Sequence, residues 1–188
     1  MSAGTASGTA AGAMAADRAV APDAAERRLF RRAAGRFPTG VTVITAMADG
    51  QPHGMTANAF STVSMDPLMI LVSLGNTSRL REHALREGAF AVTVLAAHQE
   101  ADARHFADPA RAPGAAGFAG RPWRAADHAG SPVLTEGVAA FDCSVAAAFP
   151  AGDHTVLLGR VERFDVLSHR PPLLFADSRL LPGPRPGP

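Results

Sequence analysis

The stretch from Gly54 to Ser64 is the first part of the sequence whose residue types suit ligand binding. Its small residues let a backbone approach a ligand closely. Its neutral hydrogen-bonding side chains include Thr56, Asn58, Ser61 and Thr62. Such a strand matches the alternating donors and acceptors at the edge of a flat heteroaromatic ring. Small polar strands are also common where no ligand binds, so this stretch alone assigns no function.

A second segment, from Ser73 to Ser78, suits a phosphorylated ligand. It runs into a predicted helix, and the free amides at a helix N-terminus attract anions. Arg79 or Arg81 would add positive charge at the same place. An ordinary helix cap explains the same residue types, so the segment becomes informative only together with others.

A third segment, Gly152-Asp153-His154, lies at the tip of a predicted hairpin and is followed by Gly159. Asp153 tolerates tight-turn geometry and is placed to orient the imidazole of His154. Histidine is the side chain whose charge changes most readily near neutral pH. A histidine at a loop tip is otherwise simply solvated, and both interpretations remain open at this point.

Several common chemistries lose their usual signal in this sequence. The 18 basic residues are all Arg, so no lysine is present to form a Schiff base or to complete a P-loop. The motifs GxxxxGK(S/T), GxGxxG after a strand, HExxH and GxSxG are all missing. His98 and His105 are seven residues apart on a polar segment, which argues against a metal site. The net charge of +1 does not predict a nucleic-acid-binding face.

The elements that would position these segments are indicated by hydrophobic periodicity and by turn residues. Asp23 caps a predicted helix over residues 24–35, and a helix over residues 79–87 ends at Gly88. A short helix is expected over residues 98–106, and strands over residues 41–45, 54–64, 68–74 (buried on both faces), 90–95, 141–149 and 154–167. Strands dominate and do not alternate regularly with helices, so an antiparallel barrel is favoured over a doubly wound parallel sheet. The single cysteine, Cys143, is expected to be a buried, inert thiol.

The chain is predicted to contain one domain, over residues 23–180. Residues 1–22 form a low-complexity stretch expected to be a disordered tail, and residues 181–188 a Pro- and Gly-rich C-terminal tail. No apolar run approaches the roughly 20 residues of a membrane span, and no signal peptide is evident, so we expect a cytoplasmic protein that binds no membrane. Residues 107–131 are expected to form a long surface loop, either a lid carrying Phe118 and Trp123 or a plain insertion.

The three segments follow a fourth motif, Phe37-Pro38-Thr39-Gly40-Val41-Thr42-Val43-Ile44-Thr45, in the order found in one family. Together they resemble the flavin reductase domain of two-component monooxygenase systems, from about Leu29 to Phe175. The resemblance implies a mainly β fold, the antiparallel Greek-key split β-barrel known as the FMN-binding split barrel, with a few short helices. It also implies a homodimer with flavin near the subunit interface.

The resemblance further implies which residues meet the cofactors. Those near the flavin ring system are Thr39, Gly40 and Val41. Those along the ring and ribityl chain are Thr56, Ala57, Asn58, Ser61 and Thr62. Those at the sugar alcohol and phosphate are Ser73, Leu74, Asn76 and Ser78. Those at the nicotinamide nucleotide are Gly152, Asp153 and His154, with Phe175 as a further nucleotide contact.

Two positions depart from the family pattern. Pro67-Leu68 stands where many relatives have a doubled proline. The segment from Leu173 to Arg179 is less aromatic than its counterpart in many relatives, and Phe175 is its one aromatic residue.

The implied enzyme is an NAD(P)H-dependent flavin reductase. It would reduce free FAD or FMN by hydride transfer from NADH or NADPH and release the product to a separate flavin-dependent monooxygenase. FAD is favoured because many oxygenase-linked relatives use it, and NADH because no basic cluster for a 2′-phosphate is evident. His154 would act by orienting the nicotinamide; no general base and no metal are needed, because the cofactors carry the chemistry. Two alternatives stay open: a non-enzymatic flavin-binding protein, and a pyridoxamine-phosphate-oxidase-like FMN enzyme on the same barrel.

Overall fold

The computed structural model describes residues 21–185 of the 188-residue chain. Most of the N-terminal tail predicted over residues 1–22, and residues 186–188 of the predicted C-terminal tail, lie outside the described residues. The last strand, β12 (Arg179–Pro182), runs two residues past position 180.

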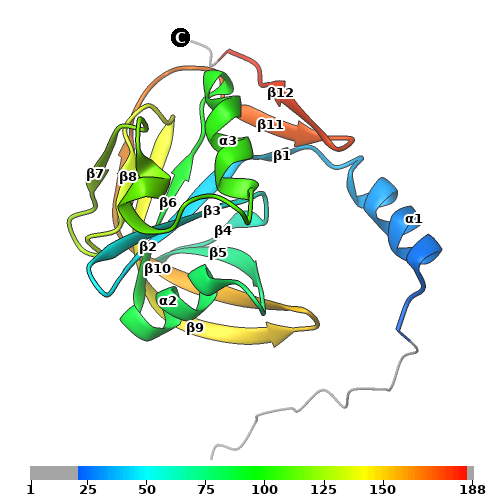
Figure 1. Ribbon diagram of the computed structural model, residues 1–188, viewed down its shortest axis with the longest axis horizontal. Coiled ribbons are helices and arrows are strands. Elements are labelled where there is room, and N and C mark those ends of the chain that lie inside the picture. The colour runs from blue at the N-terminus through cyan, green and yellow to red at the C-terminus, as the bar shows by residue number, and fades with distance from the viewer. Residues whose placement is uncertain (1–20, 186–188) are drawn as a thin grey trace, which may run out of the picture.

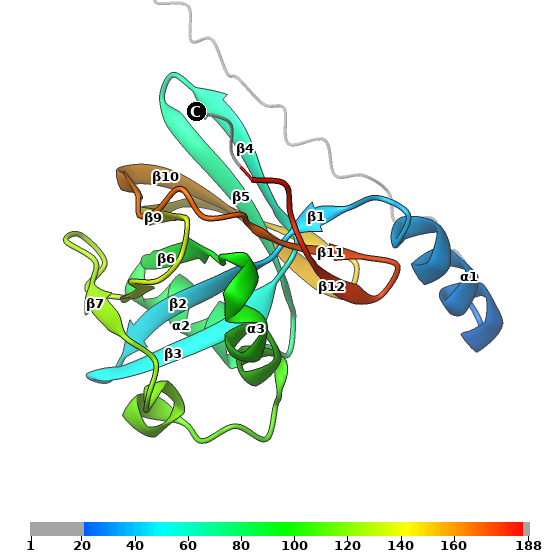
Figure 2. The same cartoon turned by 90° about the horizontal axis from the view of Figure 1, so that it is seen from above.

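Seven strands form one antiparallel sheet, and the antiparallel barrel expected from the sequence is confirmed. Their order in the sheet is β3-β2-β6-β9-β10-β5-β4. Their bounds are β2 (Thr42–Ala48), β3 (Gln51–Ala57), β4 (Phe60–Met65), β5 (Leu68–Gly75), β6 (Ala89–Val94), β9 (Ala139–Ala151) and β10 (His154–Val166). Figures 1 and 2 show that this sheet is strongly curled, with the pairs β2–β3 and β4–β5 at its two edges.

Five short strands complete the β-structure of the described residues. They are β1 (Thr39–Gly40), β7 (Trp123–Ala125), β8 (Pro132–Leu134), β11 (Leu173–Ala176) and β12. The strands β1, β11 and β12 form a second sheet in which Thr39 pairs with Phe175. This pairing joins the start of the barrel to its C-terminal hairpin, so two segments 136 residues apart lie side by side.

Residues 21–185 contain three α-helices, two of which pack on the barrel. They are α1 (Ala24–Ala34), α2 (Arg79–Glu87) and α3 (Glu100–Ala107), with 3-10 turns η1 (Ala97–Gln99) and η2 (Gly114–Phe118). Asp23 caps α1, as predicted, by accepting hydrogen bonds from the amides of Ala25 and Glu26 at 2.7 and 2.8 Å. Helix α1 buries none of its own residues and projects away from the barrel in Figure 1.

Two apolar clusters form most of the core. The first lies inside the curled sheet under α2 and includes Ile44, Val72 and Phe90. The second lies between the barrel, α3 and η2 and includes Phe106 and Phe118. Close packing explains Gly159, which the sequence had singled out, because a Cβ there would lie 2.6 Å from Cζ of Phe90.

Cys143 is fully buried in the first cluster, as predicted. Burial raises the pKa of Cys143 to about 12, so the thiol stays protonated and is a poor nucleophile.

Three sequence predictions need correction. The strand expected over residues 54–64 is two strands, because the chain turns at Asn58 and the amide of Ser73 bonds the carbonyl of Ala59 at 3.1 Å. The strand expected over residues 68–74 is buried on one face only, since its residues alternate between buried and partly exposed. Residues 107–131 are not a plain surface loop: they contain η2 and β7, and the ring of Phe118 packs 5.0 Å from that of Phe106.

Candidate functional site

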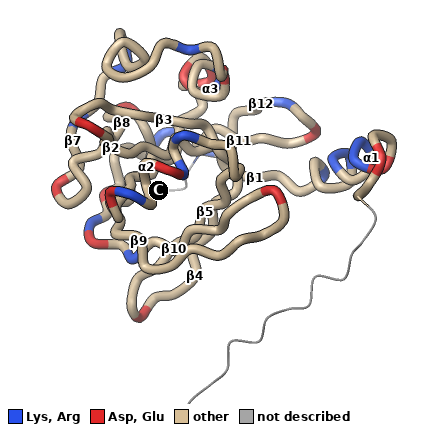
Figure 3. Tube along the Cα trace, turned by 60° about the horizontal axis from the view of Figure 1, so that its bottom comes forward, with Lys and Arg blue, Asp and Glu red and all other residues tan. Residues whose placement is uncertain are grey.

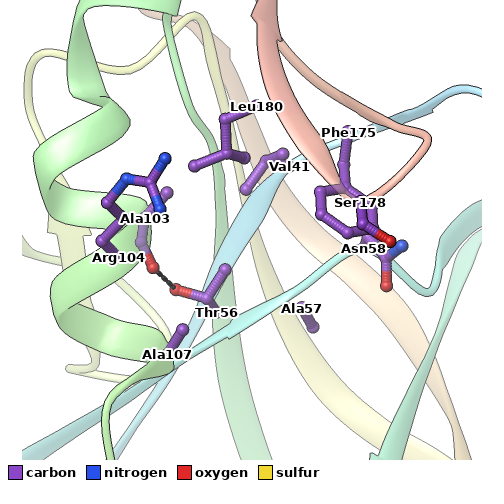
Figure 4. A pocket seen from close by; sticks show the side chains of 10 residues that line it. All are labelled: Val41, Thr56, Ala57, Asn58, Ala103, Arg104, Ala107, Phe175, Ser178 and Leu180. Atoms are coloured by element: carbon purple, nitrogen blue, oxygen red, sulfur yellow. Dashed lines mark hydrogen bonds between the residues drawn. The ribbon is translucent and has the colours of Figure 1, made fainter.

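A cavity of about 290 Å³ opens between the end of β3, helix α3 and the hairpin β11–β12 (Figure 4). It is lined by Val41, Thr56, Ala57, Asn58, Ala103, Arg104, Ala107, Phe175, Ser178 and Leu180. Five of these were predicted as cofactor contacts: Val41, Thr56, Ala57, Asn58 and Phe175. The walls are mostly small or apolar side chains, which suits a flat ring system entering from one side.

The strand pair β1–β11 closes one end of this cavity. Thr39 and Gly40 pair with Phe175 and Leu174, so the first predicted ring contacts adjoin the aromatic side chain of Phe175. The hydroxyl of Thr39 is buried and has no hydrogen-bond partner among the described residues. A buried hydroxyl normally has a partner, and a polar atom at the edge of a flavin ring fits that requirement.

Two side-chain hydrogen bonds fix the end of β3. The hydroxyl of Thr56 donates to the carbonyl of Ala103 on α3 at 2.7 Å, the contact drawn in Figure 4. The hydroxyl of Thr42 donates to the carbonyl of Ala57, also at 2.7 Å. The hydroxyl of Thr56, which the sequence suggested as a ligand contact, therefore holds α3 against the cavity. The side chain of Asn58 provides a polar group at the mouth of the cavity.

The segment before α2 and the β9–β10 hairpin tip are bonded to each other. Asn76 donates from its amide side chain to the carbonyl of Gly152 at 3.1 Å and from its backbone to the carbonyl of Asp153 at 2.9 Å. The hydroxyl of Thr155 donates to Oδ1 of Asn76 at 2.8 Å. The structure thus joins the predicted phosphate segment to the predicted nicotinamide segment.

The cap predicted at the start of α2 is only partly formed. Ser78 occupies the N-cap position but makes no side-chain bond to the helix. Its hydroxyl donates instead to Sδ of Met55 at 3.4 Å. The amides of the first turn therefore remain available to an anion.

His154 is oriented by its neighbour, as the sequence indicated. Nδ1 of the imidazole lies 2.7 Å from Oδ1 of Asp153, and about half of the side chain is exposed. The hydrogen bond with His154 is the main cause that lowers the pKa of Asp153. Asp153 therefore stays ionised and holds the ring in one orientation.

The remaining predicted residues lie beside the cavity and outside it. Ser61 and Thr62 are exposed on β4. Ser73 is partly buried on β5, whereas the side chain of Leu74 is fully buried in the core, so only its backbone can meet a ligand. Gly75 of β5 pairs with His154 of β10, and Ser73 of β5 donates its amide to the carbonyl of Ala59, next to the cavity residue Asn58.

Sequence reasoning missed half of the cavity wall. The missed residues are Ala103, Arg104, Ala107, Ser178 and Leu180. Helix α3 is polar enough to pass for a solvated surface helix, and its Glu100–Arg104 ion pair at 2.6 Å has the spacing of an ordinary surface pair. Ser178 and Leu180 lie on a hairpin of two four-residue strands, too short to leave a periodic pattern.

Two negative findings concern residues 21–185 only. In that part of the chain, no helix has both the length and the apolar character that a membrane crossing requires. The same residues contain no group of three or more His, Cys, Asp or Glu side chains arranged to hold a metal ion.

Comparison with known proteins identifies the family. Residues 34–183 match the model of the flavin reductase like domain. An NADH-dependent FAD reductase of Streptomyces globisporus is 38% identical over 157 residues, covering 84% of this chain and 86% of that protein. The flavin-dependent monooxygenase reductase subunit HsaB of Rhodococcus jostii is 38% identical over 161 residues, covering 85% of this chain and 79% of that protein.

Solved structures agree with the sequence comparisons. The NADH:FAD oxidoreductase SgcE6 of Streptomyces globisporus, solved with NAD and FAD fragments, superposes with a TM-score of 0.78 at 36% identity. The superposition covers 87% of this chain and 96% of SgcE6. The resemblance drawn from the sequence motifs and the mainly β fold that it implied are both confirmed. This chain belongs to the flavin reductase like domain family.

Proposed function

We propose that this chain is an NAD(P)H-dependent flavin reductase that reduces free FAD or FMN and supplies the reduced flavin to a separate monooxygenase. The observation that carries the proposal is the cavity at the end of β3, whose mostly small or apolar walls suit a flavin ring. Asn58 of this cavity is followed by Ala59, which accepts a hydrogen bond from Ser73 of β5, and β5 in turn pairs with His154 at Gly75.

The chain's own residues act by binding and orientation. The transfer of hydride from a reduced nicotinamide to a flavin is chemistry that the two nucleotides supply, so no protein base is required. The Thr56–Ala103 bond keeps α3 against the cavity and limits access of water to the ring. Asp153 fixes the ring of His154, which we propose positions the nicotinamide.

We propose the remaining predicted contacts in the same roles. Thr39, Gly40 and Val41 lie at the ring. The residues along the ring and ribityl chain are Thr56, Ala57, Asn58, Ser61 and Thr62. Ser73, Leu74, Asn76 and Ser78 lie at the sugar alcohol and phosphate, and Gly152 with Phe175 at the nicotinamide nucleotide. The domain carrying them is proposed to span residues 23–180.

FAD and NADH are the proposed preferred substrates. The support is that a 38% identical relative is named an NADH-dependent FAD reductase. A partner monooxygenase is proposed because HsaB is named a reductase subunit of a flavin-dependent monooxygenase. Free flavin is shared most simply within one compartment, and the proposed location is the cytoplasm.

A steady-state assay crossing NADH and NADPH with FAD, FMN and riboflavin tests the function. We expect oxidation of NADH that depends on added flavin and is fastest with FAD. A protein that binds flavin without oxidising either nucleotide would support the non-enzymatic alternative. Tightly copurifying FMN with no activity on free flavin would support the pyridoxamine-phosphate-oxidase-like alternative.

A homodimer is proposed because large apolar side chains are exposed on and beside α1. Leu29, Phe30 and Phe37 are 63%, 73% and 74% exposed. Monomeric proteins rarely expose large apolar side chains next to one another, so these residues suit a subunit interface. The same helix carries a cluster of basic residues, visible in Figure 3. We expect light scattering to give about twice the 19.4 kDa of one chain, and less after Leu29→Ser and Phe30→Ser together. A wild-type mass of one chain would contradict the proposal.

A further inference from the structure

A second cleft lies where β3, the first turn of α2 and the loop before η2 meet. Its basic side chains come from three separate segments: His53 on β3, Arg79 on α2 and Arg111 in the loop. The rings of Phe106 and Phe118 lie under the loop, and a Cβ at Gly54 would be 2.9 Å from the ring of Phe106. Glycine at this position therefore lets the loop, and with it Arg111, close on β3.

The two arginines of this cleft form no ion pair within the described residues. Arg111 is held by backbone carbonyls, donating from Nη1 to Asp108 at 2.8 Å and from Nη2 to Gly54. Within residues 21–185, neither Arg79 nor Arg111 forms an ion pair with a carboxylate. Burial, and next the charge of Arg79, lower the pKa of Arg111, and the charge of Asp108 opposes them. Two guanidinium groups that repel each other in a cleft are stabilised by an anion between them.

A pair of closely packed, tilted imidazoles adjoins the arginines. The ring centroids of His53 and His83 are 4.0 Å apart, with an interplanar angle of 37°. Both ring nitrogens of His83 are buried and have no hydrogen-bond partner among the described residues. At this separation the two rings cannot both be charged without strong repulsion. The pair therefore carries at most one positive charge.

The charged and titratable groups around His53 lie on α2, on the loop before η2 and in the turn before β3. Burial is the largest cause that lowers the pKa of His53, followed by His83 and Arg79 on α2 and then Arg111 on the loop. Asp49, in the turn before β3, opposes them, and its carboxylate is itself bonded to Arg86 at 2.9 Å. Without an anion nearby, the imidazole of His53 is neutral at pH 7. A negative charge in the cleft would reverse the balance.

We propose that this cleft is a proton-linked anion subsite, in which a phosphate-type oxyanion is held by Arg79 and Arg111 and the imidazole of His53 takes up one proton from solvent as the anion binds. The proposal rests on the proposed function, because both substrates of that function are phosphate-bearing nucleotides. The flavin phosphate, the phosphates of the nicotinamide nucleotide and free phosphate share this chemistry. Because a bound anion favours the protonated imidazole, the affinity for the anion rises as the pH falls from 8 to 6.

Sulfate is the probe for the subsite itself, because it remains a dianion over this range whereas a phosphate monoester titrates near pH 6. Calorimetry at constant ionic strength, in two buffers of different ionisation enthalpy, reports both affinity and proton uptake. We expect sulfate to bind with uptake of up to one proton and at least about 5-fold more tightly at pH 6 than at pH 8. Binding without proton uptake, or with no dependence on pH, would overturn the proposal.

Variants separate the groups involved. We expect Arg111→Gln to weaken sulfate binding about 10-fold or more. The same loss is expected for Arg79→Gln, which changes an exposed residue and serves if the first variant folds poorly. His53→Gln is expected to retain sulfate binding at pH 8 but to lose the proton uptake. Arg160→Gln is the control, since this exposed arginine pairs with Glu162 at 3.2 Å and does not line the cleft. Sulfate binding unchanged by either cleft arginine variant would refute the subsite.

Turnover assays with the same variants identify the natural ligand. A KM that rises for FMN and FAD but not for riboflavin assigns the subsite to the flavin phosphate. A KM that rises for NADH with all three flavins assigns it to the nicotinamide nucleotide, and unchanged KM values with lost sulfate binding assign it to free phosphate. Wild-type protein that turns over no flavin yet binds sulfate with proton uptake would sink the proposed function alone, so the two failures are distinguishable.

Discussion

Replacing His154 with alanine is expected to lower kcat/KM for the reduced nicotinamide nucleotide by about 10- to 100-fold, while the KM for flavin changes little. The imidazole is held by Asp153 at 2.7 Å and is half exposed at the hairpin tip, so it can contact a ligand without supporting the core. A loss confined to one substrate is what removal of a positioning contact produces. Steady-state kinetics with each substrate varied in turn give the two constants.

Asp153→Asn is the matched variant for this prediction. Asparagine keeps the size of the side chain and the turn, but it replaces the ionised acceptor that orients the imidazole. The loss of kcat/KM should therefore be smaller than for His154→Ala and again restricted to the nicotinamide nucleotide. Unaltered parameters in His154→Ala would remove His154 from the site, and an equal loss for both substrates would point to a disturbed hairpin.

The longer elements of the fold were predictable because their signals are local. The helix over residues 79–87 was predicted with its observed bounds, since Gly88 adopts a positive φ of 69° that ends it. The β9–β10 hairpin was predicted within two residues at most of its bounds, because the run 150–153 breaks two alternating stretches. The split at Asn58 was missed, since it depends on the bond between Ser73 and Ala59 and not on the residue types at the turn.

The site was predictable only where its residues occur in compact motifs. The β3 contacts and the hairpin tip each lie within a few residues of sequence, and the structure places both beside the cavity or joined to it. Its other wall comes from α3 and the β11–β12 hairpin, which meet β3 only through tertiary packing. The cationic cleft is harder still, because His53, His83 and Arg111 are separated by about 30 residues each. No local pattern marks residues that become neighbours in this way.

The cavity itself is tested by filling it from the helix that sequence reasoning missed. Ala107 is exposed in the last turn of α3, and its side chain lines the cavity opposite Asn58 (Figure 4). An indole at this position would occupy space that the flavin ring needs without displacing any buried side chain. We expect Ala107→Trp to lower kcat/KM for flavin about 100-fold, because even a small misplacement of reacting rings is costly.

The control for this substitution lies on the same helix. Ala101 is also exposed on α3 but does not line the cavity, so Ala101→Trp adds the same side chain where no ligand is proposed. The free energy of unfolding of both variants should lie within about 1 kcal/mol of the wild-type value, since each change is on the surface. Equal flavin kinetics in the two variants would mean that the ring binds elsewhere. We expect a loss of activity in Ala107→Trp alone. If higher flavin concentrations restore the rate and higher NADH concentrations do not, the flavin ring lies between α3 and β3.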